Sequence, residues 1–129
     1  MNKKDCLFVS EQIMCSHDDV DIYYDAVVGY NERLELVVRL SISDYDERGK
    51  NISEVYVTRD DAYALSRRLN VRMLELPSRL ARCAVVSRRS AINPPASEIR
   101  DSFREVIARL DYYHCPYRWR HMRWVKDSM

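Results

Sequence analysis

The sequence predicts an α+β domain, in which an antiparallel β-meander of three to four strands is followed by about three α-helices packed on one sheet face. Apolar and polar residues alternate with period two in three segments between Val20 and Val57, and apolar residues recur at helical spacing after Thr58. The chain has 129 residues, a common size for one domain, and its 47% hydrophobic content is typical of a globular protein. We therefore predict a single domain over 1–129, with a sheet half at about 6–57, a helical half at about 58–113 and a basic-aromatic C-terminal tail at 114–129.

The predicted strands follow from the alternation. The clearest one runs from Val20 to Gly29 and is followed by turn residues at Gly29–Glu32. A second strand at 34–42 should pair with it antiparallel, and a polar loop leads to a third strand at Ile52–Val57. Cys6–Val9 fits a short fourth strand. This meander should have one face against the helices and one face in water.

Three helices are predicted from capping residues and apolar stripes. The Thr58 hydroxyl can cap the first helix, and Asn70 can end it in the left-handed conformation. Pro77 suits the first turn of a second helix. The strongest helical pattern starts near Ala96 and ends before Pro116, so this third helix should cover the sheet.

The outward face of the meander is the first candidate binding site. Acidic side chains and tyrosines share this face, and such a mixture suits electrostatic steering followed by aromatic anchoring on a protein partner. The predicted contact residues are Asp21, Tyr23, Asp25, Glu35, Arg39, Glu54 and Tyr56. The hypothesis requires this face to remain accessible after the helices have packed on the other side.

The C-terminal tail is the second candidate site. Aromatic residues interleave with arginines there, which suits an acidic protein surface or a single-stranded nucleic acid. The residues are Tyr117, Arg118, Trp119, Arg120, Arg123 and Trp124. Their spacing fits neither a helix nor a strand well, and the tryptophans could instead fold back to complete the core.

The charge is distributed unevenly along the chain. Residues 1–58 carry 6 basic and 12 acidic side chains, a net charge of −6, whereas the remainder has 15 and 8, a net charge of +7. Two interpretations follow: either the basic half packs beside the acidic half, or the two halves form separate surfaces of opposite sign.

No pattern indicates catalysis, a metal or a cofactor. The Cys and His residues lack the spacing of a zinc site, and the acids near the first strand occupy positions where solvated acids are usual. These residues are Cys15, His17, His114, Cys115 and His121 for zinc, and Asp18, Asp19, Asp21 and Asp25 for the acidic group. The two glycines leave none for a phosphate-binding loop, and no motif places a nucleophile beside a base. We predict no catalytic residue, no metal and no cofactor. A small hydrolase or nuclease is a third alternative, and it would require an enclosed polar cleft with convergent titratable groups.

The favoured hypothesis is a small non-catalytic protein-binding domain of the inhibitor, immunity or adaptor type. The alternative is a nucleic-acid-binding module that uses the Arg/Trp/Tyr-rich C-terminal segment. Neither a signal peptide nor a membrane-length apolar run is present, and the scattered cysteines fit reduced thiols, so we expect a cytoplasmic protein. An edge strand could also pair with a second copy of the chain.

Overall fold

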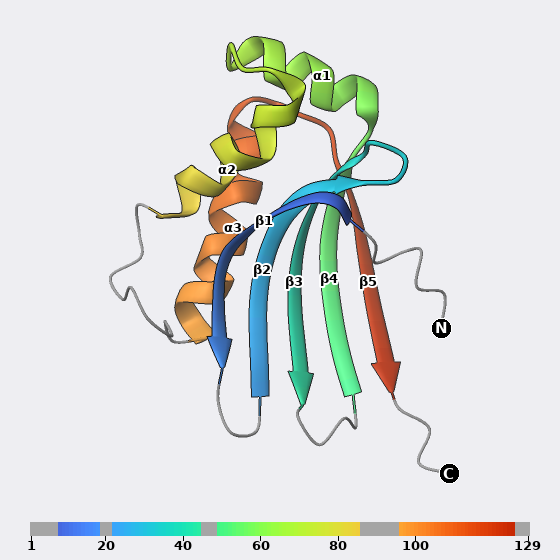
Figure 1. Ribbon diagram of the computed structural model, residues 1–129, viewed down its shortest axis with the longest axis vertical. Coiled ribbons are helices and arrows are strands. Elements are labelled where there is room, and N and C mark those ends of the chain that lie inside the picture. The colour runs from blue at the N-terminus through green and yellow to red at the C-terminus, as the bar shows by residue number, and fades with distance from the viewer. Residues whose placement is uncertain (1–7, 19–21, 45–48, 86–95, 126–129) are drawn as a thin grey trace.

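The computed structural model describes residues 8–18, 22–44, 49–85 and 96–125, with side chains described over 25–42, 51–82 and 99–122. Within these ranges the chain forms one antiparallel sheet with strand order β1-β2-β3-β4-β5, and helices pack against it (Figure 1). The elements are β1 (Phe8–Asp18), β2 (Ile22–Asn31), β3 (Leu36–Asp44), β4 (Gly49–Val57), α1 (Arg59–Arg68), the short 3₁₀ helix η2 (Met73–Glu75), α2 (Leu76–Val85), α3 (Ala96–Tyr112) and β5 (Arg118–Val125). The predicted α+β class is confirmed, and the tail adds β5 to the predicted meander.

The turn between β2 and β3 lies two residues later than the sequence predicted. Gly29 lies inside β2, opposite Val37, and the turn spans Asn31 to Leu34. The Asn31 side chain explains this shift, because its Oδ1 accepts hydrogen bonds at 3.0 Å from the backbone N–H groups of Arg33 and Glu35. Asparagine side chains stabilise turns by bonding to their own backbone in this way, whereas Gly29 has no positive φ that a turn would use.

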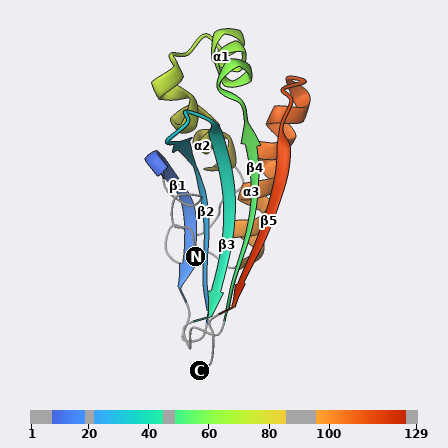
Figure 2. The ribbon, with the colours of Figure 1, turned by 90° about the vertical axis from the view of Figure 1, so that its right-hand side faces the viewer.

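The first strand is longer than the predicted Cys6–Val9 and includes two irregularities. Its register with β2 shifts between Phe8 and Ser10 and again between Ile13 and Cys15. Bulges of this kind bend a strand and increase its twist. Figures 1 and 2 show the result, since the beginning of β1 turns away from the edge and passes across the end of the sheet nearest α1.

The helix ends follow the predicted caps. The Asp61 N–H donates to the Thr58 hydroxyl at 3.3 Å, and Asn70 adopts a φ of 58°, so both predicted ends of α1 are confirmed. The α3 helix begins at Ala96 as predicted. It ends in the same type of motif as α1, with His114 at a φ of 55° and the Cys115 N–H bonded to the Leu110 carbonyl at 2.9 Å.

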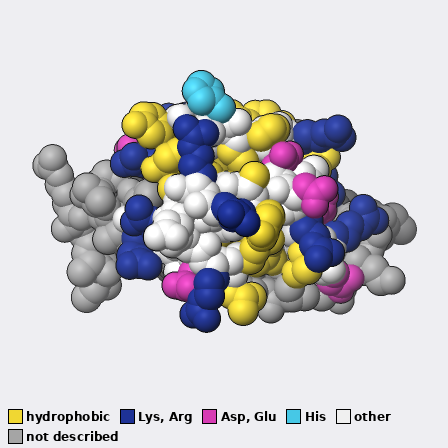
Figure 3. All heavy atoms as spheres, turned by 90° about the horizontal axis from the view of Figure 1, so that it is seen from above, with side chains coloured by type: hydrophobic (Ala, Val, Ile, Leu, Met, Phe, Trp, Pro, Cys, Tyr) yellow, Lys and Arg dark blue, Asp and Glu magenta, His cyan; other side chains and the backbone are white. Residues whose placement is uncertain are grey.

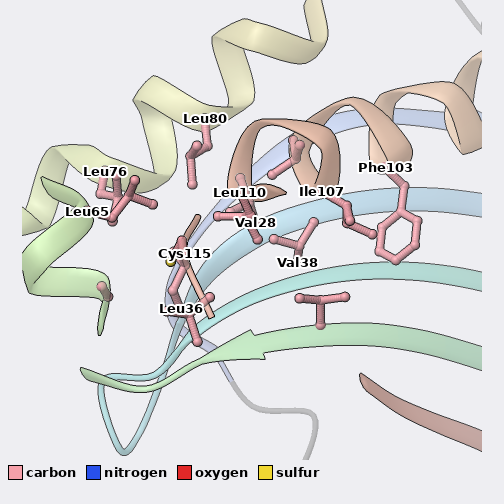
Figure 4. Close-up of a cluster of buried hydrophobic side chains, with 14 of the residues drawn as sticks. Val28, Leu36, Val38, Leu65, Leu76, Leu80, Phe103, Ile107, Leu110 and Cys115 are labelled. Atoms are coloured by element: carbon pink, nitrogen blue, oxygen red, sulfur yellow. The ribbon is translucent and has the colours of Figure 1, made fainter. Parts of the chain in front are cut away.

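The core lies between the helices and one sheet face. Both α2 and α3 contact β1 and β2, and α3 also contacts β3. Figure 4 shows side chains from the strands and from all three helices meeting in this layer. Its fully buried members include Val28, Leu36, Val38, Val55, Leu76, Leu80, Ile99, Val106 and Leu110. The main helix contacts are thus with β1, β2 and β3, and the candidate site lies at the other edge of the sheet, at β5.

Candidate functional site

The C-terminal tail forms an edge strand of the sheet. Residues 118–125 pair antiparallel with β4, which places Arg120 opposite Glu54 and Arg118 opposite Tyr56. The structure thereby joins the two predicted sites, because part of the sheet-face set and part of the tail set lie side by side. Pairing with β4 settles the ambiguous spacing of the tail in favour of a strand.

Glu54 is buried, although the sequence predicted it on a wet face. It lies on the face opposite the helices as expected, but only 1% of its surface is exposed. Arg120 forms an ion pair with it, and the Arg120 Nε donates to Glu54 Oε1 at 2.6 Å. The Arg120 guanidinium also lies 5.6 Å from the centre of the Tyr56 ring. Glu54 therefore holds β5 on β4, and a partner cannot reach it directly.

Much of the remaining outward face is also less accessible than predicted. Val27, Val37 and Ile52 lie on this face, and each is less than 5% exposed. Asp25 and Arg39 are half-buried. Among the described side chains of the outward face, the accessible surface is therefore concentrated toward β5, where Arg118 is exposed.

The other three residues predicted on the outward face are Glu35, Tyr23 and Asp21. Glu35 lies in the turn, where its Oε1 accepts a hydrogen bond from Asn31 Nδ2 at 2.9 Å. Tyr23 lies on β2 opposite Ser43, and its side chain is outside the described set. Asp21 lies outside the described residues altogether.

Trp119 is the most exposed of the tail aromatics that can be placed. It lies on the helix side of β5, opposite Val55, and 58% of its surface is exposed. Its ring meets Phe103 of α3 edge-to-face at 6.1 Å and Tyr117 at 6.4 Å. The Tyr117 hydroxyl donates to Asp111 Oδ1 at 2.7 Å, and this bond raises the pKa of Tyr117. Trp119 is therefore held in position by the core while most of its surface faces solvent.

The other residues of β5 extend this surface. Arg118 is exposed, and His121 Nδ1 lies 3.0 Å from the Ser53 hydroxyl on β4. Arg123 and Trp124 pair with Asn51 and Lys50 of β4, but their side chains are outside the described set. We define the β5 surface as Tyr56, Tyr117, Arg118, Trp119 and His121. In the described sheet, β5 has a neighbouring strand only on its β4 side.

A small pocket lies between α1 and the connection from α3 to β5. Its volume is roughly 160 Å³, and it is lined by Asp61, Ala64, Leu65, Arg68, Tyr113, His114, Cys115 and Pro116. Desolvation, together with the negative charge of Asp61, raises the pKa of Cys115 to about 11. The thiol is protonated at neutral pH, so this pocket does not provide an activated nucleophile. Across the part of the chain that the structure describes, no three His, Cys, Asp or Glu residues are grouped to hold a metal.

Exposed apolar side chains also occur at the α1 end of the molecule, and the sequence analysis missed them. They are Leu34, Tyr63, Leu74 and Tyr112, with exposures of 42%, 51%, 80% and 69%. Figure 3 views this end and shows hydrophobic side chains separated by many basic and several acidic ones. Tyr63, Leu74 and Tyr112 lie outside the apolar stripes of the predicted helices, and this is the sequence signal that could have found them. Leu34 was predicted to point inward at the start of the second strand, but it lies in the turn before β3. These four side chains provide a useful comparison for the β5 surface.

Comparisons with known proteins found no match to a family model, a curated protein or a solved structure. Among the described residues, no helix combines the length and the apolar character needed to cross a membrane. Function is therefore inferred from the geometry of the β5 surface.

Proposed function

We propose that this chain is a small non-catalytic protein-binding domain, of the inhibitor, immunity or adaptor type, that acts in the cytoplasm through the β5 surface. The observation that carries the proposal is Trp119, a largely exposed indole fixed against Phe103 and placed beside Arg118 on an edge strand. Tryptophan and arginine are the residues that most often dominate protein interfaces. A pre-ordered indole also loses little side-chain entropy when a partner binds.

Nucleic-acid binding is the second candidate function, because β5 reads RWRHMRWV and contains no acidic residue. Two observations favour a protein partner instead. Arg120 covers the Tyr56 ring and pairs with Glu54, which hinders base stacking on that tyrosine. Arg118 and Trp119 are consecutive strand residues and so lie on opposite sheet faces, which prevents one nucleotide strand from using both on one face.

Site-specific photo-crosslinking in the native cell tests the proposal. A benzoylphenylalanine in place of the exposed His121, two residues after Trp119 on the same face of β5, should give a discrete protein adduct, whereas the same group in place of the 80%-exposed Leu74 should not. With the captured protein purified, Trp119→Ala should weaken its binding at least tenfold and Tyr63→Ala should leave it unchanged. Recovery of only free monomer from position 121 would reject the proposal, and a nuclease-sensitive adduct there would favour the nucleic-acid alternative.

A further inference from the structure

We infer that β5 binds an extended, acidic segment of the partner by strand addition, so that the partner supplies a sixth strand to the sheet. This inference rests on the proposed function and specifies its binding mode. An edge strand presents a row of backbone N–H and C=O groups, and extended peptides add to such rows in known recognition modes. The described sheet ends at β5, which gives eight residues of strand for this contact.

The charge of β5 indicates the chemistry of the added segment. The strand contains three arginines and a histidine without any acid, and Glu54 of β4 pairs with Arg120. An acidic segment complements this charge. A second copy of the chain is a poorer occupant, because two β5 strands side by side would bring six arginines into one strand pair, and like charges across strands are destabilising.

The alternation of side chains along β5 predicts the order of acidic and apolar residues in the added segment of the partner. Residues of an added strand point alternately to the two sheet faces, as do Arg118 and Trp119. An acidic residue on the outward face would lie near Arg118. The next residue would lie on the helix face near Trp119, where Phe103 and Tyr117 already provide apolar surface. The expected ligand is therefore a segment in which acidic and apolar residues alternate.

Synthetic octapeptides with blocked ends test this inference on the full chain at low salt. A fluorescently labelled peptide of alternating Glu and Val should bind at least tenfold more tightly than a peptide with four Glu followed by four Val, and more tightly than alternating Lys and Val. Arg118→Glu should weaken binding of the Glu–Val peptide at least tenfold, whereas Arg59→Glu on α1 should change it less than twofold.

Backbone methylation tests the strand geometry directly. In an antiparallel pair, alternate residues direct their N–H groups to the neighbouring strand. Methylating the amides of one alternate set in the Glu–Val peptide should abolish binding, whereas methylating the other set should preserve it. Equal loss in both sets, or no preference for alternation, would overturn strand addition.

The outcomes separate this inference from the proposed function. If position 121 still crosslinks a protein but the order of peptide residues has no effect, the chain binds proteins by another mode and strand addition is wrong. If sedimentation instead shows a dimer that Arg118→Glu strengthens, because the substitution relieves the repulsion between arginines of two β5 strands, β5 pairs with a second copy and the inference is wrong. If none of the peptides binds, strand addition of an acidic segment is wrong.

Discussion

At the scale of single residues, Tyr30 links the sheet to the helical half. Its side chain is 2% exposed, and its hydroxyl donates to the Met73 carbonyl of η2 at 2.6 Å. Tyr30→Phe removes this hydrogen bond, so the partly buried Met73 carbonyl loses its donor. We expect the free energy of unfolding to fall by about 1 kcal/mol at neutral pH, as measured by urea denaturation.

The pH dependence of the same variant provides an independent check. Desolvation raises the pKa of Tyr30 from 10.0 to about 12 in the folded protein. Between these values the unfolded chain loses the proton first, so the stabilising contribution is complete below pH 10 and is lost as the pH rises toward 12. The unfolding free energy of the parent protein should therefore fall more steeply over this interval than that of Tyr30→Phe. Parallel curves for the two proteins would contradict the assignment.

At the scale of elements, the β2–β3 hairpin contains a residue in an unfavourable conformation. Leu34 has a φ of 60° and is 42% exposed. A bulky residue in the left-handed region costs about 1–2 kcal/mol, and glycine avoids that cost at the expense of a more flexible unfolded chain. We expect Leu34→Gly to raise the unfolding free energy by up to about 1 kcal/mol in urea denaturation.

The turn offers a matched control for this prediction. Asn31→Ala removes the acceptor of two backbone hydrogen bonds in the same hairpin, so it should lower the unfolding free energy by about 1–2 kcal/mol. Leu34→Ala retains a Cβ atom at the same φ and should bring less stabilisation than Leu34→Gly. Equal effects of glycine and alanine at position 34 would show that backbone conformation is not the cause.

At the scale of the whole molecule, the sequence predicted those strands and helix ends that depend on residues close together in the chain. Alternation found β2 to β4, while Thr58 and Asn70 defined α1, because caps and periodicity act over a few residues. The role of the tail was not predictable, since its pairing depends on β4, and Glu54 and Arg120 are 66 positions apart in sequence. Glu54 is buried because of the same contact with Arg120, which lies far away in the sequence. The candidate site was thus predicted as two sets of residues, and only the sheet register joins them.

The ion pair between Glu54 and Arg120 also connects the acidic half of the chain with the basic half, as the first interpretation of the charge distribution expects. Arg120→Ala should leave a buried carboxylate without this partner and lower the unfolding free energy by about 2–3 kcal/mol. Arg118→Ala, on the exposed part of the same strand, should change it by less than about 0.5 kcal/mol. Adding Glu54→Gln to Arg120→Ala should recover part of the loss, because the buried charge is then absent. Urea denaturation of the four proteins measures these differences, and equal losses for the two arginine variants would show that the pair does not hold β5 on the sheet.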